Sequence, residues 1–398
     1  MVHPSKRLSY IGVSPTMKVS AKAKELKAKG IDVIDLSVGE PDFPTPENIK
    51  EAAKKAIDNN KTKYTVNTGL PELRKAIAEK LKRDNNLDYD INQIVVSSGA
   101  KQSLFNTILS ILYVGDEMII PAPYWVSYPH MVSVAQGESV ILDTTEENGF
   151  KATARQIEEA ITPYTKALLL CNPSNPTGSA YTEAELEEIA EVVENKEIYI
   201  IADEIYEKLV YGDYKFTSFA SLSEKIKNKT IVINGVSKAY SMTGWRIGFA
   251  AGPPEVITGI NKIQSHSTSN ASSISQYAAL EAFSGNQNAV EEMRKEFERR
   301  LEYFHNALTN IEGITCYKPQ GAFYLFPNIS HYFGKSFNAN TVNNSVDLAL
   351  YLLENANVAV VPGSAFGKEG FLRMSFATSI ENLEKAVERI RTALSKLN

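Results

Sequence analysis

The stretch ALLLCNPSNPTGSAYTEAELEEIAEVVENKEIYIIAD, residues 167–203, contains two apolar runs on either side of a segment with helical spacing. The runs at residues 167–171 and 198–203 are apolar without alternation, which is typical of strands buried on both faces of a sheet. Between them, residues 182–194 have the periodicity of a helix. A strand, a helix and a second strand in this order predict a unit of a parallel sheet.

The same alternation of apolar runs and helical stretches extends through the middle of the chain. Between the runs lie helical stretches such as residues 101–112, so we predict an α/β fold whose mostly parallel sheet is covered by helices on both faces. The predicted strands are residues 94–97, 118–120, 139–142, 167–171, 198–203, 231–234 and 247–250.

The C-terminal part has a different pattern. Charged helical spacing at residues 289–308 is followed by short β-rich runs, by a helical stretch at 346–354 and by a final one at 380–396. This mixture predicts a smaller α+β domain. The polar stretch HSTSNASSIS, residues 266–275, is loop-like but too short to separate domains. We expect two domains, listed here by residue range: a large one, 46–288, and a small one, 1–45 with 289–398.

Composition excludes several classes of protein. The formal net charge is −5 and charged residues make up 22% of the chain, whereas a nucleic-acid-binding protein would favour a basic stripe. The two cysteines, Cys171 and Cys316, lie far apart, so no disulfide is expected. The first ten residues lack the apolar core of a secretory signal, and no apolar run reaches the length of a membrane span. The five histidines lack metal-ligand spacing, so we expect a cytoplasmic enzyme without a metal site.

Four short motifs follow predicted strands, at the edge where ligands gather in open α/β sheets. The first, SSGAK at residues 97–101, leads into a helix, where free backbone N–H groups and the helix dipole suit a phosphate. The second, NPSNPTG at residues 172–178, is a rigid turn that predicts Asn175 as a fixed hydrogen-bond donor. Each motif alone is also compatible with an ordinary cap or loop, so their shared placement carries the argument.

The third motif, ADEIYEKLVY, begins at residue 202 and places Asp203 at the end of a buried strand. A carboxylate there is costly unless it is paired, and a protonated pyridine nitrogen would be a suitable partner. Tyr206 could reach the same ring. The structural alternative for Asp203 is the N-cap of a helix.

The fourth motif, GVSKAYSMTGWRIG at residues 235–248, contains Ser237, Lys238 and Arg246 among small residues. Most lysines lie solvated on the surface, but Lys238 follows a predicted strand. Burial and cationic neighbours make a lysine amine nucleophilic, as a lysine that binds an aldehyde covalently requires. The planar guanidinium of Arg246 suits a phosphate dianion.

Together these motifs resemble those of the fold-type I pyridoxal-phosphate (PLP) enzymes, in particular the class I aminotransferases. Among these, the chain is similar to the bacterial and thermophile-type aspartate aminotransferases, from SPT at residues 14–16 to FLRMSFA around Arg373. The resemblance implies the PLP-dependent transferase fold type I, with a mostly parallel seven-stranded sheet in a large domain and a smaller α+β domain. It also implies a homodimer with active sites at the interface.

The resemblance assigns roles around the cofactor. It implies that Lys238 holds PLP covalently and carries the proton between substrate and cofactor, while Asp203 pairs with the pyridine nitrogen. Asn175 and Tyr206 would hydrogen-bond the phenolic oxygen, and Trp125 would stack on the ring. The residues implied at the phosphate are Gly99, Ala100, Lys101, Ser237, Arg246 and, from the neighbouring subunit, Tyr64.

For the substrate, the resemblance implies that Arg373 binds the α-carboxylate and that Gly39 contributes a backbone contact. Trp125 and Asn175 are also implied to contact the substrate. Better-known aspartate aminotransferases bind the distal carboxylate with an arginine that residues 266–275 lack. The residues implied in its place, as in the thermophile-type subgroup, are Lys101, Ser14 and Thr16.

The leading functional hypothesis is reversible amino transfer between L-aspartate and 2-oxoglutarate, giving oxaloacetate and L-glutamate. One alternative is a bifunctional aspartate/prephenate aminotransferase, although Gly12 stands where such enzymes often carry a basic residue. Others are a PLP-dependent lyase or an aromatic aminotransferase on the same fold. A transcription regulator with this fold would carry an N-terminal DNA-binding domain, and here the fold is expected to begin within the first residues.

Overall fold

The computed structural model describes residue 5, residue 12 and residues 16–338 and 340–398, without the side chains of residues 16–20, 27 and 340. Its centre is a seven-stranded sheet with the strand order β2-β8-β7-β6-β5-β3-β4. Only β8 runs antiparallel to its neighbours, so the prediction of a mostly parallel sheet is confirmed. The strands are β2 Ile94–Ser97, β3 Glu117–Ala122, β4 Glu138–Asp143, β5 Thr165–Cys171, β6 Tyr199–Asp203, β7 Thr230–Gly235 and β8 Gly248–Ala251.

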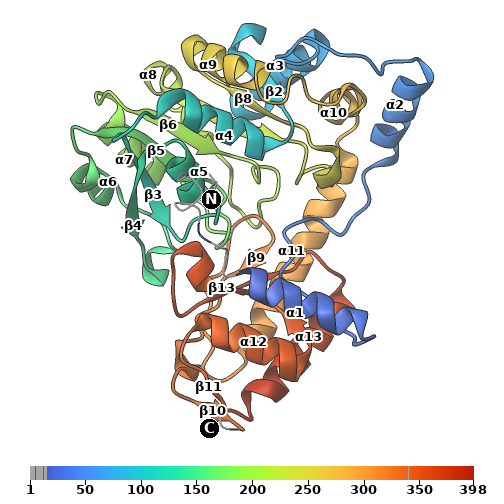
Figure 1. Ribbon diagram of the computed structural model, residues 1–398, viewed down its shortest axis with the longest axis vertical. Helices are drawn as coiled ribbons and strands as arrows, with labels where there is room; N and C mark the ends of the chain where they lie inside the picture. Colours follow the sequence, from blue (N-terminus) through green and yellow to red (C-terminus); the bar gives the residue numbers. More distant parts are fainter. Residues whose placement is uncertain (1–4, 6–11, 13–15, 339) are drawn as a thin grey trace.

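Helices cover both faces of this sheet (Figure 1). Successive residues of one strand contact different layers: Leu169 packs with α4, α5 and α9, whereas Leu168 packs with α6, α7 and α8. This is why β5 and β6 have apolar runs without alternation. The first layer consists of α4 Ala100–Ile111, α5 Tyr128–Val134 and α9 Pro254–Ser265. The second consists of α6 Ala154–Ala160, α7 Glu183–Val193 and α8 Glu224–Lys227. At the β2–β8 end, the core also includes α2 Glu47–Asp58, α3 Pro71–Asn85 and α10 Ser273–Ser284.

The loop predicted over residues 266–275 is shorter in the structure. Its last residues form the start of α10, which begins at Ser273. The hydroxyl of Ser272 accepts a hydrogen bond from the backbone N–H of Ser275 and caps the helix. A polar serine run is therefore partly a helix start here, because serine is a favoured capping residue.

A second group of elements lies beside the sheet, in the lower half of Figure 1. Its core contains residues from both ends of the chain. The helices are α1 Thr16–Ala28, α11 Asn288–Thr309, α12 Ser345–Ala356 and α13 Ile380–Leu394. The short strands are β1 Ile34–Asp35 with β12 Val358–Ala359, β10 Ser336–Phe337 with β11 Asn340–Thr341, and β13 Val361–Pro362, β14 Leu372–Ser375 and β9 Tyr324–Leu325 in one sheet.

We propose that the two groups are domains formed by residues 46–288 and by residues 1–45 with 289–398. The core of the second group also contains Ile205, Tyr206, Leu209 and Tyr211, which follow β6. This segment therefore joins the end of a central strand to the core of the other group.

Among the described residues, no helix has both the length and the hydropathy that a membrane crossing needs.

Candidate active site

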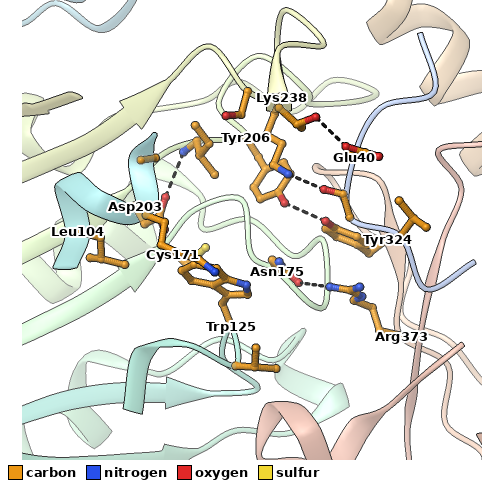
Figure 2. A pocket seen from close by; sticks show the side chains of 18 of the residues that line it. Glu40, Leu104, Trp125, Cys171, Asn175, Asp203, Tyr206, Lys238, Tyr324 and Arg373 are labelled. Carbon is orange, nitrogen blue, oxygen red and sulfur yellow. Dashed lines mark hydrogen bonds between the residues drawn. The ribbon is translucent and has the colours of Figure 1, made fainter. Parts of the chain in front are cut away.

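A cavity of about 500 Å³ lies where the carboxyl ends of the central strands meet the second group of elements. This is the place where open α/β sheets bind ligands, and the volume suits a small organic molecule. Figure 2 shows side chains from both groups pointing into it. The predicted site residues that line it are Gly39, Ala100, Lys101, Trp125, Asn175, Asp203, Tyr206, Ser237, Lys238, Arg246 and Arg373.

Lys238 lies in the turn after β7, and its ammonium donates a hydrogen bond of 2.5 Å to the carbonyl oxygen of Gly39. Burial, together with the positive charges of Arg373 and Arg246, lowers the pKa of Lys238 to about 8. The charges of Glu40 and Asp203 oppose this shift. An amine with such a pKa is partly neutral near physiological pH and can attack an aldehyde.

Asp203 is the last residue of β6, and its carboxylate is buried. Its Oδ2 atom accepts a hydrogen bond of 2.8 Å from the Tyr128 hydroxyl, and Oδ1 accepts a longer one, 3.4 Å, from the N–H of Ile205. Burial raises the pKa of Asp203 to about 6, while the Tyr128 hydrogen bond and the charge of Lys238 act in the opposite direction. A carboxylate held in this way is ready to pair with a cationic ring nitrogen.

Tyr206 contacts a residue that lies far away in the sequence. Its hydroxyl is 2.9 Å from the hydroxyl of Tyr324 on β9, and either of the two can be the donor. Burial raises the pKa of Tyr206 well above its ordinary value, so the phenol stays protonated. Tyr206 therefore has a proton to donate to an oxygen in the cavity, with Tyr324 fixing the orientation of its hydroxyl.

Arg373 on β14 is buried and held on two sides. One terminal nitrogen donates to Asn175 Oδ1 at 3.1 Å, as Figure 2 shows, and the other to the carbonyl of Ser37 at 2.7 Å. The guanidinium also lies over the rings of Tyr324 and Phe366, with 4.5 and 5.1 Å to their centroids. Its Nε atom is buried without a hydrogen-bond partner among the described residues. This fixed cation is suited to binding a carboxylate.

The start of α4 forms a cradle with Arg246. Gly99 precedes the helix with φ 91°, and a Cβ atom there would lie 2.3 Å from Nη2 of Arg246. A Cβ on Gly248 would lie 2.1 Å from the backbone nitrogen of Ala100. Arg246 is held by the carbonyls of Thr243 at 2.8 Å and Ser98 at 3.4 Å. Only glycine permits this close approach of a guanidinium to a helix N-terminus, an arrangement that suits a phosphate.

Lys101 and Trp125 form one wall of the cavity. The Lys101 ammonium lies 4.7 Å from the centroid of the Trp125 ring, a cation–π contact. Partial burial and the positive charge of Arg246 lower the pKa of Lys101. Together with Arg373, Lys101 gives the cavity a second cation for an anionic substrate group.

The outcome differs for Tyr64, Ser14 and Thr16. Tyr64 is 92% exposed and does not line it. Ser14 lies outside the described residues, and Thr16 is described only as the first residue of α1. Their assigned roles stay predictions.

Sequence reasoning missed several residues of the site: Glu40, Tyr128, Cys171, Tyr324 and Phe366. The spacing of Tyr128 from Trp125 offered a weak signal, because three residues separate neighbours on one helical face. Tyr324 lies in the run GAFYLF, residues 321–326, whose local sequence predicts a strand but no site. Cys171 and Cys316 are free thiols, and burial raises the pKa of each to about 12.

Comparison with known proteins identifies close relatives. Residues 31–390 match the family model of class I and II aminotransferases. An aspartate aminotransferase of Bacillus sp. (strain YM-2) is 52% identical over 385 residues, covering 96% of this chain and 97% of that one. A probable aspartate/prephenate aminotransferase of Rickettsia bellii is 48% identical, covering 99% of both. The crystal structure of the aspartate aminotransferase from Rhizobium meliloti superimposes with a TM-score of 0.97 at 45% identity, covering 100% of both chains.

Proposed function

Because the chain belongs to the class I and II aminotransferases, we propose that it is an aspartate aminotransferase. It would move an amino group reversibly between L-aspartate and 2-oxoglutarate, giving oxaloacetate and L-glutamate. The observation that carries this proposal is one cavity that holds a nucleophilic amine, Lys238, together with two cations, Arg373 and Lys101, besides the Arg246 proposed for the phosphate. Two cations suit a substrate with two carboxylates, since a buried carboxylate without a partner is costly.

We propose PLP as the cofactor, and the donor set of the cavity fits it. When bound, PLP supplies an aldehyde that takes up the amino group and a ring that accepts electrons. The backbone N–H groups of Gly99, Ala100 and Lys101, with the side chains of Ser237 and Arg246, would bind its phosphate. The residues that would hold the ring are Asp203 at its nitrogen, Asn175 and Tyr206 at its phenolic oxygen, and Trp125 on its face.

The residues of this chain would then act on the substrate. Arg373 binds the α-carboxylate and so fixes the α-carbon near Lys238. The Nζ atom of Lys238 removes the proton from that carbon and later returns a proton, as a general base and acid whose lowered pKa suits both roles. Lys101, with Ser14 and Thr16, binds the distal carboxylate, and Gly39, Trp125 and Asn175 complete the contacts to the substrate.

We also propose a homodimer in which Tyr64 reaches the phosphate at the neighbouring subunit's site. The exposure of Tyr64 is compatible with this role, because its side chain is open to contact with a second chain. The free state of both cysteines supports a cytoplasmic location, where thiols stay reduced.

A second candidate is an aspartate/prephenate aminotransferase. Some of the relatives carry that name as a probable function at 47–48% identity over nearly their full length. Prephenate is also a dicarboxylate, so the same pair of cations suits it. The aspartate hypothesis stays first because relatives at 49–52% identity are named aspartate aminotransferases.

A half-reaction tests the proposal. Protein loaded with PLP and mixed with L-aspartate alone should release one oxaloacetate per site and change its cofactor absorbance, and 2-oxoglutarate or, in a second arm, prephenate should restore the absorbance. A lyase would instead turn over repeatedly without an amino acceptor and would leave the cofactor in its aldehyde form. Failure to release a stoichiometric keto acid from aspartate would refute aspartate transamination.

A further inference from the structure

The segment from Ser37 to Thr45 crosses the mouth of the cavity and connects β1 of the second group to α2 of the first. In this segment the backbone carbonyl of Gly39 accepts the hydrogen bond of the Lys238 ammonium. Gly39 also lies close to Tyr324, because a Cβ on Gly39 would be 3.0 Å from the Tyr324 hydroxyl. Any side chain at this position would therefore press against the Tyr324 hydroxyl.

Glu40 follows Gly39 directly, and its carboxylate reaches the loop that carries Lys238. Its Oε2 atom accepts a hydrogen bond of 2.7 Å from the hydroxyl of Thr243, five residues after Lys238. The backbone carbonyl of the same Thr243 accepts from Arg246 at 2.8 Å. Figure 2 shows Glu40 beside Lys238 at the edge of the cavity. Glu40 thus bonds to the loop between the catalytic amine and the phosphate-binding arginine.

Other bonds hold the two ends of the segment but not its centre. Arg373 binds the carbonyl of Ser37 at 2.7 Å, and Asp42 pairs with Arg300 on α11 at 2.7 Å. Thr45 donates to the carbonyl of Ser241 at 2.7 Å and accepts from Trp245 Nε1 at 3.0 Å. Between Ser37 and Asp42, the bonds to the Lys238 loop are those of Gly39 and Glu40.

The chemistry of the reaction gives the Glu40 bond a distinct purpose. When Lys238 Nζ is covalently occupied it has fewer hydrogens to donate, so the Gly39 carbonyl loses its strong donor. The Glu40–Thr243 bond does not depend on the state of Lys238. A carboxylate accepts a stronger hydrogen bond than a neutral acceptor does. This strength gives a reason for a glutamate at the mouth of a site for anionic substrates, although its negative charge repels such substrates.

We propose that Glu40 is a positioning residue, whose bond to Thr243 keeps the Gly39 carbonyl beside Lys238 and holds residues 37–42 over the catalytic amine. The inference rests on the proposed amino transfer for its catalytic consequence only. Glu40 acts through Gly39 and Thr243, and its negative charge also raises the pKa of Lys238 against the two arginines.

Hydrogen–deuterium exchange of residues 37–45 tests the bond itself, in the full chain with and without PLP. Glu40→Ala and Thr243→Val each remove the bond from one side, so each should speed exchange about three- to tenfold, and more in the PLP-loaded protein. Glu40→Gln keeps a neutral acceptor and should fall between these variants and the wild type. The double variant should exchange no faster than either single one, because the two changes remove the same interaction.

Two matched variants serve as controls. Glu47→Gln on α2 removes one negative charge from an exposed glutamate that pairs with Lys50, away from the cavity. Thr258→Val on α9 removes a threonine hydroxyl that donates to the carbonyl of Pro254. Both should leave exchange at residues 37–45 as in the wild type.

Steady-state kinetics separate positioning from simple charge repulsion. If Glu40 positions the segment, Glu40→Ala and Thr243→Val should both lower kcat about three- to tenfold with a smaller change in KM for aspartate. If its charge merely repels the substrate, the Glu40 variants alone should change KM, and Thr243→Val should behave as the wild type, which would overturn the proposal. Unchanged exchange in Thr243→Val would overturn it as well. The exchange measurement needs no amino transfer, so it stands even where the proposed function fails.

Discussion

The hydroxyl of Tyr128 donates a hydrogen bond of 2.8 Å to Oδ2 of Asp203, and both side chains are buried. Tyr128 is the first residue of α5, whereas Asp203 ends the central strand β6. The bond fixes one carboxylate oxygen and opposes the effect of burial, which raises the pKa of Asp203 to about 6. Asp203 is therefore ionised at neutral pH but at a cost in stability that a cationic ligand would remove.

The first prediction concerns that cost. The pKa of Asp203 in the folded chain lies above its ordinary value of 3.8. As the pH rises from 4 to 6, the unfolded chain therefore loses this proton before the folded chain does. The folded state loses stability across that pH range. Without cofactor, Asp203→Asn should therefore stabilise the protein by on the order of 3 kcal/mol at pH 7 and about 1 kcal/mol at pH 4.5. Urea unfolding at the two pH values measures this.

Asp213→Asn, which changes an exposed aspartate, is the control and should have little effect. In the PLP-loaded enzyme, Asp203→Asn should lower the stability instead of raising it, because the ring nitrogen loses its counter-ion. For the same reason, the variant should slow proton abstraction by several orders of magnitude. A stabilisation that does not depend on pH would show that the carboxylate charge is not its cause.

The second prediction concerns the amine. With a pKa of about 8, Lys238 is mostly protonated at pH 6.5 and mostly neutral at pH 9. The neutral amine is the nucleophile, so the rate at which the cofactor-free chain binds PLP covalently should rise with pH, with a midpoint near 8, and level off about one pH unit higher. Borohydride followed by peptide mapping locates the label. A midpoint near 10, or a label on another lysine, would contradict the assignment.

The sequence was most informative where burial leaves a strong pattern. All seven central strands were predicted. Strands such as β5 and β6 are buried and therefore apolar almost throughout, whereas the edge strand β4 is only partly buried, and the motifs could then be placed at strand ends. Asp203, Asn175 and Lys238 come together in the cavity for that reason. The chemical roles assigned to them rest on the resemblance and stay predictions.

Contacts between distant segments left no such pattern. Tyr206 and Tyr324 are 118 positions apart, and Thr243 lies 203 positions from Glu40. Nothing in the local sequence of either partner indicates the other, because these pairs depend on how the two groups of elements pack. The start of α10 at Ser273 was missed for a local reason, since serine is common both in loops and at helix caps.

The third prediction concerns assembly. If Tyr64 completes the site of the neighbouring subunit, a dimer made of one Tyr64→Phe chain and one Lys238→Ala chain has one site with both native residues. Random mixing of these two impaired proteins should then give fully native residues at about a quarter of the sites, because half of the dimers are mixed. Activity after mixing and refolding measures this. A catalytically active monomer, or no restored activity, would contradict it.

The fourth prediction concerns specificity, and it compares the two cations proposed to bind substrate carboxylates. Arg373 is buried and fixed by Asn175 and Ser37, as suits the α-carboxylate that every amino acid shares. Lys101 lies over Trp125 on a flexible chain and is the cation proposed for the distal carboxylate. Arg373→Ala should therefore weaken all substrates together, whereas Lys101→Ser should act mainly on aspartate and glutamate.

Charge-assisted hydrogen bonds contribute on the order of 1.5–3 kcal/mol. In Lys101→Ser, kcat/KM for aspartate should therefore fall about ten- to a hundredfold or more beyond any fall in kcat/KM for an aromatic or aliphatic amino acid. Lys82→Ser on α3, which removes an exposed lysine, controls for the loss of one charge. Kinetics with aspartate, glutamate, phenylalanine and alanine give the comparison. A lysine that selects dicarboxylates must distinguish them from neutral substrates. An equal loss for all four substrates would therefore mean that Lys101 serves the phosphate or the start of α4. The distal carboxylate would then need another partner.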